Sequence, residues 1–461
     1  MISFISETEF KKTIKNTSFF NVELPKVSFE PFETYRLKNT EILWVNKDLL
    51  SKYDIKGTID EIEQLLLDEY SYVSLDYACS NRLDVREQKI FWADRYGSRH
   101  EVCNGGSARC GFDGCFQIKG IGLTPLLAQN MSRSHSNGKL FLDEAISEAI
   151  WGEICHKHLP FGAIRTLAII KTNIKEVFLY SDNKPMKPCA LVIREFATRP
   201  AHFERSTFFW PSQENMHLRN NDADRVKEAI SILPNILKLT ESEKPCGKIL
   251  FQCLKKMILS IAKQIAYSRV KGIPHGSLTS SNISVDGRFL DFGTITAVPD
   301  FGNYILSRGV GSVWDDHQLI LNWLQNLFDT LNKYKSYEEN ISSNEMKMLK
   351  EIFINEIDRQ ENISLLEELS VKNIKDSDLE KAKIIKNRLI SPYRMNLGHF
   401  NDEVFKIMVK KIALDVGLDV GDIKFELRSF RYSSFSILNN TTLDNNEYSK
   451  KSVSTLIDSY C

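Results

Sequence analysis

The chain has 461 residues, of which 42% are hydrophobic and 10% aromatic, so it carries enough apolar material for a sizeable core. Lys and Arg together number 60, as do Asp and Glu, and a net charge of zero gives no general argument for a nucleic acid or an anionic membrane as partner. The length fits two or three structural units, or a two-lobed enzyme with extensions.

The sequence has no recognisable targeting or membrane-spanning segment. Its start, MISFISETEFKK, lacks a basic segment followed by an apolar run, and no stretch reaches about 18 apolar residues. We therefore expect a cytoplasmic protein without a membrane span, whose nine cysteines are reduced thiols. Cys110 with Cys115, and Cys155 with His156 and His158, lack a second pair at zinc-site spacing, which favours ordinary thiols and histidines over a metal site.

The N-terminal half is predicted to hold strands and one long helix. Residues 1–89 form an extension packed on the next part, with a strand at 42–45 and a helix at 59–69. Residues 90–205 form an N-lobe, with expected elements over 115–120 (strand), 140–156 (helix), 166–180 (strand) and 190–196 (strand).

Two side chains of this N-lobe are candidates for chemistry. Lys119 lies on the strand over 115–120, directly after a Gly-rich turn, and Glu148 lies on or near the apolar side of the helix over 140–156. Backbone N–H groups can approach an anion closely at glycines, so the turn is a candidate phosphate cradle.

Residues 206–461 are predicted to form a helical C-lobe. Its elements are expected over 249–270 (helix), 275–293 (polar hairpin), 315–332 (helix) and 335–385 (charged, solvated helical insert). The hairpin carries Asn282 and Asp291, and the last fifteen or so residues are polar and expected to be loose.

These parts together indicate kinase-like phosphate chemistry. A lysine can steady phosphate oxygens while a helix Glu holds it, and Asn282 with Asp291 would offer the hard oxygen ligands that magnesium prefers. Each fragment alone is weak, because Asp-Phe-Gly occurs by chance and a strand lysine is usually a solvated edge residue. Their order along the chain is what favours the functional interpretation.

Longer stretches resemble one known family. Residues 117–125 are similar to the lysine strand of the selenoprotein O (SelO/YdiU) pseudokinase-like protein adenylyltransferases, and 137–139 with the helix that follows is similar to that family too. Arg194 and the run 199–204 look like its phosphate-gripping arginines, and 275–291 looks like its metal-binding hairpin. The resemblance runs from about residue 90 to about residue 300.

This resemblance implies an α+β, protein-kinase-like two-lobed fold that uses ATP and Mg²⁺, with Mn²⁺ as an alternative, and transfers AMP to a protein hydroxyl. It implies phosphate contacts by Lys119, Arg194 and Arg199, orientation of Lys119 by Glu148, and metal ligation by Asn282 and Asp291, with Lys119, Glu148 and Asp291 as the catalytic residues. It also implies a loop over the phosphates, formed by Gly105, Gly106, Ser107 and Arg109, although this loop departs from the family's Gly-Asp-Gly-Arg-Ala pattern.

The same residues have ordinary alternative interpretations. Arg194 and Arg199 could form surface ion pairs of little energetic value, and Glu148 could be the polar edge of its helix. Asn282 and Asp291 could be turn residues. His275 is better explained as a structural residue that holds the hairpin by hydrogen bonds than as a catalytic one.

One departure from the family bears on the acceptor. The family has an Asp, proposed as the base, immediately before its metal-binding Asn, and here that position is Ser281. Serine is a poor base, so a hydroxyl acceptor would lose its proton abstractor, whereas a carboxylate acceptor is already anionic at pH 7. The substitution therefore hints at activation of a carboxyl group as an acyl-adenylate.

A narrower resemblance agrees with this hint. Residues 92–111 look like a divergent branch, the MchC/MceJ-type proteins of siderophore-microcin maturation, which work with an acyltransferase-like partner on the C-terminal carboxylate of a precursor peptide. The leading hypothesis is thus adenylyl transfer to a peptide or protein, in a hetero-oligomer with such a partner and without nucleic acid. The alternatives are AMPylation of Ser, Thr or Tyr hydroxyls, and an inactive nucleotide-binding pseudokinase that binds a partner.

Overall fold

The computed structural model describes residues 24–97, 103–129, 137–179, 182–239, 247–334, 340–394, 397–442 and 448–460. The chain forms two compact units, one comprising residues up to 153, 164–236 and 441 onward, the other comprising 154–163 and 237–440. The predicted α+β class is confirmed, since the first unit holds a large antiparallel sheet and the second is mainly helical. The kinase-like arrangement and the predicted three-part division stay predictions.

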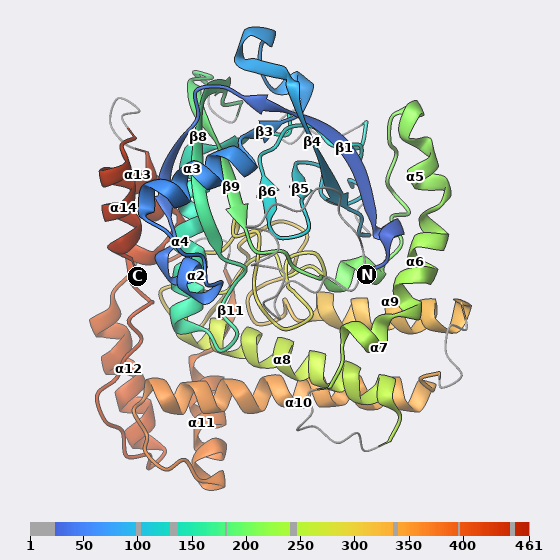
Figure 1. Cartoon of the computed structure of the whole chain (residues 1–461). Helices are drawn as coiled ribbons and strands as arrows, with labels where there is room; N and C mark the ends of the chain where they lie inside the picture. The colour runs from blue at the N-terminus through green and yellow to red at the C-terminus, as the bar shows by residue number, and fades with distance from the viewer. Residues whose placement is uncertain are drawn as a thin grey trace. The chain divides into compact units, whose positions relative to one another are not determined.

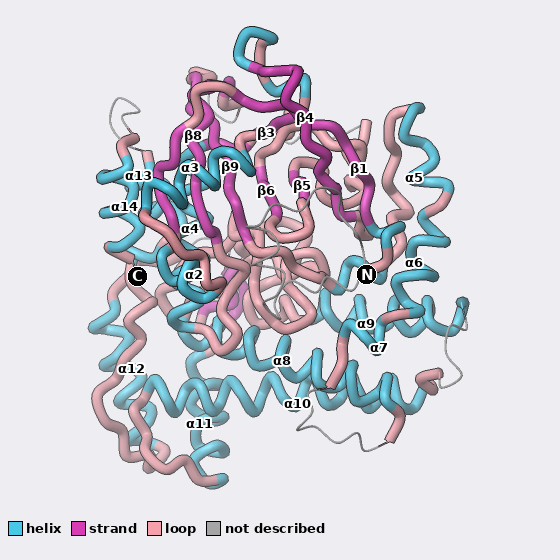
Figure 2. The backbone as a smooth tube through the Cα atoms, viewed as in Figure 1, coloured by secondary structure: helices cyan, strands magenta, loops and turns pink. Residues whose placement is uncertain are grey.

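A nine-stranded antiparallel sheet is the centre of the first unit (Figures 1 and 2). Its strand order is β2-β8-β9-β6-β5-β4-β1-β3, and the short β7 also pairs with β9. The strands are β1 (Phe29–Leu37), β2 (Glu41–Val45), β3 (Tyr72–Val73), β4 (Leu83–Asp94), β5 (Cys110–Phe112), β6 (Gln117–Lys119), β7 (Leu140–Phe141), β8 (Thr166–Val177) and β9 (Met186–Arg194).

The helices of the first unit complete its core. They are α2 (Lys47–Lys52), α3 (Ile59–Tyr70), α4 (Leu142–His158), which crosses the boundary at residue 153, α5 (Met216–Asn220), α6 (Asp222–Ser231), α7 (Leu233–Ile236) and α14 (Lys450–Asp458). A capping box at Thr58 and Glu61 starts α3, whose Ile62 and Leu66 then join one apolar cluster with residues of the sheet. The helix predicted over 59–69 is therefore confirmed.

Other predicted elements of this unit are also confirmed, with shifted ends. Residues 42–45 lie in β2, the long helix is α4, and the two later strands are β8 and β9. The strand expected over 115–120 is shorter, because only Gln117–Lys119 pairs with its neighbours. The sequence did not predict β1 and β4. The outer part of β4, Asp84 to Gln88, is polar apart from Val85 and mostly exposed, so it lacks the alternating apolar pattern that marks a strand.

The second unit is built on two long helices. These are α8 (Ile249–Lys271) and α10 (Ser343–Glu368), which pack against each other. The remaining elements are α9 (Gln318–Tyr334), α11 (Asp376–Leu389), α12 (Asp402–Asp415), α13 (Ser434–Thr441) and the two-stranded parallel pair β10 (Gly302–Tyr304) and β11 (Ser391–Arg394). The helices predicted over 249–270 and 315–332 correspond to α8 and α9.

The prediction of a solvated insert over 335–385 was partly wrong. Residues 335–339 lie outside the described residues, and α10 and α11 confirm the helical character of the rest. Both helices bury an apolar face, however, because Leu365, Leu366 and Ile385 belong to one core cluster. High charge content concealed this apolar stripe, since the charged residues occupy the other positions of each turn.

The prediction of a loose C-terminus was wrong for residues 448–460. Val453 and Ile457 lie four residues apart on α14 and are fully buried, and α14 packs against β2. Among the helices of the described residues, none is both long and apolar enough to cross a membrane.

Candidate functional site

A buried carboxylate in the first unit joins two cations. Lys119 and Arg194 end the adjacent strands β6 and β9, and Glu148 lies on α4. The Glu148 Oε2 atom accepts a hydrogen bond from Lys119 Nζ at 2.8 Å, and Oε1 accepts one from Arg194 Nη1, also at 2.8 Å. The predicted contact between Glu148 and Lys119 is therefore present.

The burial of this cluster makes its charge balance significant. The side chains of Lys119, Glu148 and Arg194 are 7%, 8% and 2% exposed. Burying charges is costly unless they are paired, and one carboxylate here faces two cations. Each oxygen of the Glu148 carboxylate thus accepts from a different cation, and two cations held together in this way suit an anionic ligand such as a phosphate group.

Gln117 is a further member of the cluster that the sequence did not single out. Its Oε1 atom accepts hydrogen bonds from Arg194 Nε at 3.0 Å and Nη2 at 2.7 Å. Its Nε2 atom donates to Asp94 Oδ1 at 2.8 Å. Gln117 and Lys119 are two residues apart on β6, so they share one face of the sheet. That spacing was the available signal, although it does not reveal the partners.

Asp94 also reaches the segment that carries Arg199. Its Oδ2 atom accepts a hydrogen bond from His202 Nε2 at 3.3 Å. The Nδ1 atom of the same ring lies 2.9 Å from the Arg199 amide nitrogen, and 3.2 Å from the Arg199 carbonyl oxygen. Because an amide N–H can only donate, the shorter contact assigns Nδ1 as an acceptor and leaves the proton on Nε2.

Burial and pairing act in opposite directions on these two groups. Burial would raise the pKa of Asp94, but the hydrogen bond from His202 and the charge of Arg199 outweigh it and hold the pKa below its ordinary value. Burial lowers the pKa of His202 despite the neighbouring carboxylate. The pair is therefore an ionised Asp94 and a neutral His202 near pH 7.

The Arg199 side chain and the backbone that follows it are held by different neighbours. Its guanidinium carbon lies 4.7 Å from the centroid of the Tyr96 ring, and its side chain is almost fully buried. Arg225 of α6 donates to the carbonyl oxygen of His202 at 2.8 Å and also to that of Glu204. The segment after β9 is thus fixed by α6 through its backbone carbonyl groups.

The Gly-rich turn packs closely against the end of β4. The amide of Gly105 donates to Leu126 O at 3.0 Å, and that of Ser107 to Asp94 O at 2.9 Å. Gly106 has a φ of 142°, and a Cβ there would lie 2.2 Å from Asp94 O. Close packing alone therefore requires glycine here. Arg109 donates to Lys139 O at 3.3 Å. The phosphate-covering role of this loop stays a prediction. The amides of Gly105 and Ser107 already donate to backbone carbonyls, so they are not counted among the groups that would bind phosphate.

The predicted hairpin of the second unit is present as a tight loop. Ile283 and Phe289 form an isolated antiparallel bridge, and the Leu290 amide donates to Asn282 O at 3.2 Å. The Asn282 Nδ2 atom donates to Ser277 O at 2.8 Å, and Oδ1 lies 3.4 Å from the Ser281 hydroxyl. Oδ1 is therefore the atom of this amide that could ligate a cation, and metal ligation by Asn282 stays a prediction. Asp291 has a φ of 60°, which a non-glycine residue seldom adopts and which is often found at functional sites.

His275 supports this loop, as the structural interpretation expected. It is fully buried, and its Nε2 atom lies 2.9 Å from Leu290 O, so the nitrogen donates and carries the proton. Burial lowers the pKa of His275, which keeps the ring neutral. The ring therefore holds the peptide that directly precedes Asp291.

The donor set of this loop fits a hard divalent cation. One amide oxygen and one carboxylate can ligate magnesium when phosphate oxygens and water supply the remaining positions. Within the described part of the chain, no group of three or more His, Cys, Asp and Glu side chains could hold a metal by itself. Cys246 and Cys461 lie outside that part, and the seven described cysteines form no disulfide.

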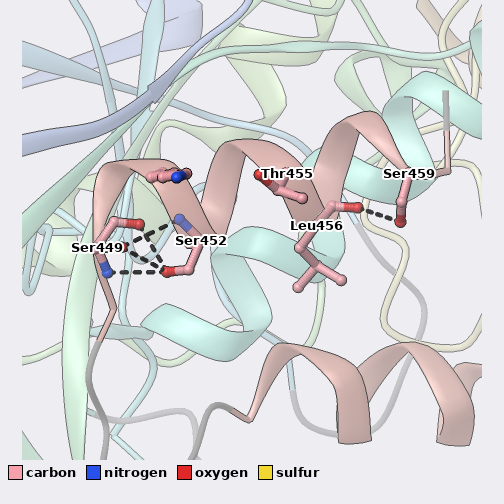
Figure 3. Close-up of a pocket in the computed structure, with 6 residues that line it drawn as sticks. Ser449, Ser452, Thr455, Leu456 and Ser459 are labelled. Carbon is pink, nitrogen blue, oxygen red and sulfur yellow. Dashed lines mark hydrogen bonds between the residues drawn. The ribbon is translucent and has the colours of Figure 1, made fainter.

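A hollow of about 550 Å³ lies along α14 in the first unit (Figure 3). Its lining residues are Ser449, Lys451, Ser452, Thr455, Leu456 and Ser459. None of the predicted site residues lines it, so it has no part in the site described above.

The middle of the chain is similar to known proteins. Residues 107–308 match the family model described as protein adenylyltransferase SelO. Two curated proteins, both described as protein nucleotidyltransferase YdiU, come from Trichodesmium erythraeum (strain IMS101) and Shewanella loihica (strain ATCC BAA-1088 / PV-4). They are 27% identical over 192 residues and 24% identical over 184 residues, and each match covers 40% of this chain.

The chain matches only 37% and 34% of the length of these two relatives. The SelO-like resemblance found in the sequence is confirmed over residues 107–308, the segment that carries Lys119, Glu148, Arg194, Arg199 and the loop with Asp291. The resemblance of residues 92–111 to the microcin-maturation branch stays a prediction.

Proposed function

We propose that this chain is a nucleotidyltransferase that moves AMP from ATP to a peptide or protein, on a kinase-like two-lobed fold in the cytoplasm. The carboxylate of Glu148, which joins Lys119 and Arg194 in a buried cationic cluster, is the observation that carries this proposal. The cluster lies within the SelO-like segment, and the family model that matches this segment is described as protein adenylyltransferase SelO.

The residues divide the work as follows. Lys119, Arg194 and Arg199 bind and orient the phosphates. Glu148 holds the side chains of Lys119 and Arg194 in position by hydrogen bonds. Asn282 and Asp291 would hold Mg²⁺, or Mn²⁺ in its place, and the metal when bound would neutralise charge on the phosphates. The acceptor attacks the α-phosphorus and pyrophosphate leaves.

Ser281 favours a carboxylate as the acceptor. Its hydroxyl lies 2.9 Å from Thr279 Oγ1, and neither group can serve as a base near pH 7. A peptide C-terminal carboxylate needs no base, and its adenylation gives an acyl-adenylate that an acyltransferase-like partner could use in siderophore-microcin-type maturation. AMPylation of protein hydroxyls is the alternative.

Position-specific labelling of ATP tests the proposed activity. The protein is incubated with Mg²⁺ and a candidate peptide, and with ATP labelled at the α-phosphate or, separately, at the γ-phosphate. We expect α-label on the acceptor and γ-label in pyrophosphate only. Transfer of the γ-label alone contradicts the proposal, and binding of Mg²⁺-ATP without turnover under any condition indicates an inactive pseudokinase.

Two comparisons distinguish the acceptors. An acyl-adenylate reacts with hydroxylamine to give a hydroxamate, and a peptide with an amidated C-terminus cannot form it. We expect hydroxamate from the free-acid peptide alone. Hydroxyl AMPylation would instead give a hydroxylamine-stable AMP adduct on both peptides, and the Ser281→Asp variant would then increase its rate.

A further inference from the structure

We infer that Asp94 is a positioning residue that joins the two predicted phosphate-binding arginines, Arg194 and Arg199, into one clamp. This inference rests on the proposed function. Asp94 is the last residue of β4. Its carboxylate contacts Gln117 on one side and His202 on the other, and it acts on the two arginines through these side chains.

Asp94 determines which group donates and which accepts in each hydrogen bond between Arg194 and Arg199. An ionised carboxylate only accepts, so Gln117 must turn its Nε2 toward Asp94 and its Oε1 toward Arg194. For the same reason His202 must turn its Nε2–H toward Asp94, which leaves Nδ1 to accept from the Arg199 amide. One carboxylate thus orients the acceptors that hold both arginine residues.

Water cannot easily replace these contacts. Asp94 and His202 are fully buried, and Gln117 is 2% exposed. A buried polar group without a partner costs the full penalty of its desolvation. If one of these hydrogen bonds brings two donors or two acceptors together, a neighbouring side chain must therefore turn or lose its own partner.

An isosteric Asp94→Asn substitution therefore has no satisfactory arrangement. If the new amide nitrogen faces Gln117, that side chain must flip, and its amide then confronts the donors of Arg194. If the new nitrogen faces His202, the ring must adopt the other tautomer, and Nδ1–H then turns to the Arg199 carbonyl while the Arg199 amide loses its acceptor. Either outcome disturbs one arginine.

A double substitution restores the series of hydrogen bonds, with the donor and the acceptor exchanged between residues 94 and 117. In Asp94→Asn with Gln117→Glu, the Asn oxygen accepts from His202 and its amide donates to the new carboxylate, whose other oxygen accepts from Arg194. The total charge is unchanged, because one negative charge moves by one side chain. A merely structural role would show this recovery in the free energy of unfolding but not in the affinity for the nucleotide.

The experiment measures nucleotide binding rather than turnover. Titration calorimetry with α,β-methylene-ATP and Mg²⁺ is applied to the wild type, both single variants and the double variant, and urea unfolding of the same proteins is measured alongside. We expect each single variant to bind about tenfold more weakly, the equivalent of about 1.4 kcal/mol, and the double variant to recover most of that loss.

Asp113→Asn is the matched control. Asp113 is also a buried carboxylate, whose Oδ1 accepts from the amides of Cys115 and Phe116 in the turn between β5 and β6. We expect this variant to change the free energy of unfolding without changing the affinity for the nucleotide.

The outcomes separate the two proposals. Wild-type affinity in Asp94→Asn, or a double variant that binds no better than the weaker single variant, overturns the positioning role. A wild-type protein that binds no nucleotide overturns the proposed function, while the coupling of the two substitutions in urea unfolding still tests the hydrogen-bond chain. If Asp94→Asn does not fold, a folded and binding double variant supports the inference, and an unfolded one overturns it.

Discussion

Lys119 is the residue on which the cationic cluster depends most directly. Because it donates to Glu148 at 2.8 Å and is almost fully buried, removing its amine takes away a proposed phosphate ligand and one of the cations that contact the carboxylate. We expect Lys119→Ala to remain folded and to lower kcat/KM for AMP transfer by about 100-fold or more. Lys171→Ala is the control, since Lys171 also lies on a strand and pairs with Glu41 at 2.7 Å, but at a more exposed position. Equal rates in both variants would refute the site.

Asp291 allows stability and activity to be separated. At its φ of 60°, glycine relieves backbone strain while removing the carboxylate. We therefore expect Asp291→Gly to stay within about 1 kcal/mol of the wild-type free energy of unfolding and to lose AMP transfer. Asn373→Gly is the control, because Asn373 has a φ of 54° in the same unit. Transfer at the wild-type rate in Asp291→Gly would exclude this carboxylate from the site.

The sequence predicted some side-chain pairs of the site and missed others for a physical reason. The contact of Lys119 with Glu148 could be anticipated, because a strand lysine and a helix acid in that order have a known joint role. Gln117 and Asp94 could not, since a polar residue on a strand does not reveal which distant side chain will satisfy it in the core.

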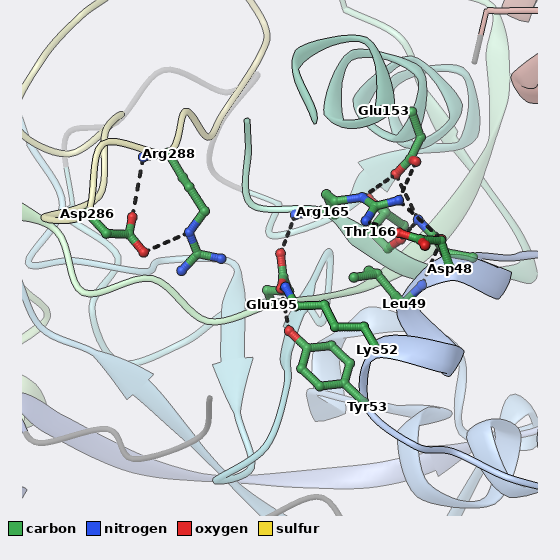
Figure 4. A network of polar contacts seen from close by, with 11 residues as sticks. Asp48, Leu49, Lys52, Tyr53, Glu153, Arg165, Thr166, Glu195, Asp286 and Arg288 are labelled. Carbon is green, nitrogen blue, oxygen red and sulfur yellow. Dashed lines mark hydrogen bonds and ion pairs between the residues drawn. The ribbon is translucent and has the colours of Figure 1, made fainter. Parts of the chain in front are cut away.

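At the scale of elements, a second polar network fixes the helix that carries Glu148. Arg165, just before β8, donates to both oxygens of Glu153 on α4, at 2.8 and 2.5 Å, and its amide donates to Glu195 at 3.0 Å (Figure 4). Asn46 also donates to Glu153, at 2.7 Å. Because Glu153 follows Glu148 by little more than one helical turn, this network sets the position of α4 against the strands.

Glu153→Gln tests this network. The substitution removes one of the two carboxylates, Glu153 and Asp48, that pair with the buried guanidinium of Arg165, so we expect the free energy of unfolding to fall by about 1–3 kcal/mol, measured by urea denaturation. AMP transfer should fall less than in Lys119→Ala, since no phosphate ligand is lost. Glu41→Gln, which alters an exposed pair, should change stability by less than about 0.5 kcal/mol. Equal stability of the two variants would mean that α4 is held by its apolar face alone.

The elements differ in how well the sequence predicted them. α3, α4 and α8 each carry apolar residues at helical spacing and were predicted nearly to their ends. β1 and β4 were missed because their pairing, not their own pattern, makes them strands, and the buried face of α10 was concealed among charged residues.

On the scale of the whole molecule, buried and half-buried histidines link stability to pH. Burial lowers the pKa of His158, His202 and His275, and lowers that of His317 to about 4. The unfolded chain therefore binds protons that the folded chain does not, once the pH falls below about 6.5. The contribution of these histidines to the free energy of unfolding is fully present above that pH. It is lost as the pH falls, until the pKa of each histidine in the folded state is reached. Buried acids with raised pKa values, such as Asp316, act in the opposite direction.

His317→Gln isolates one of these contributions. The His317 Nδ1 atom lies 2.9 Å from Arg269 Nη2, and a glutamine oxygen can accept that hydrogen bond without titrating. Between pH 6.5 and 4.5 the wild type should lose up to about 1.4 kcal/mol per pH unit more than the variant, because one extra proton is taken up on unfolding. Urea denaturation at several pH values measures the difference, with His217→Gln, at an exposed position, as the control. Parallel curves for the wild type and His317→Gln would mean that His317 is protonated in the folded protein, and that Arg269 is held by Asp316 and Glu361 alone.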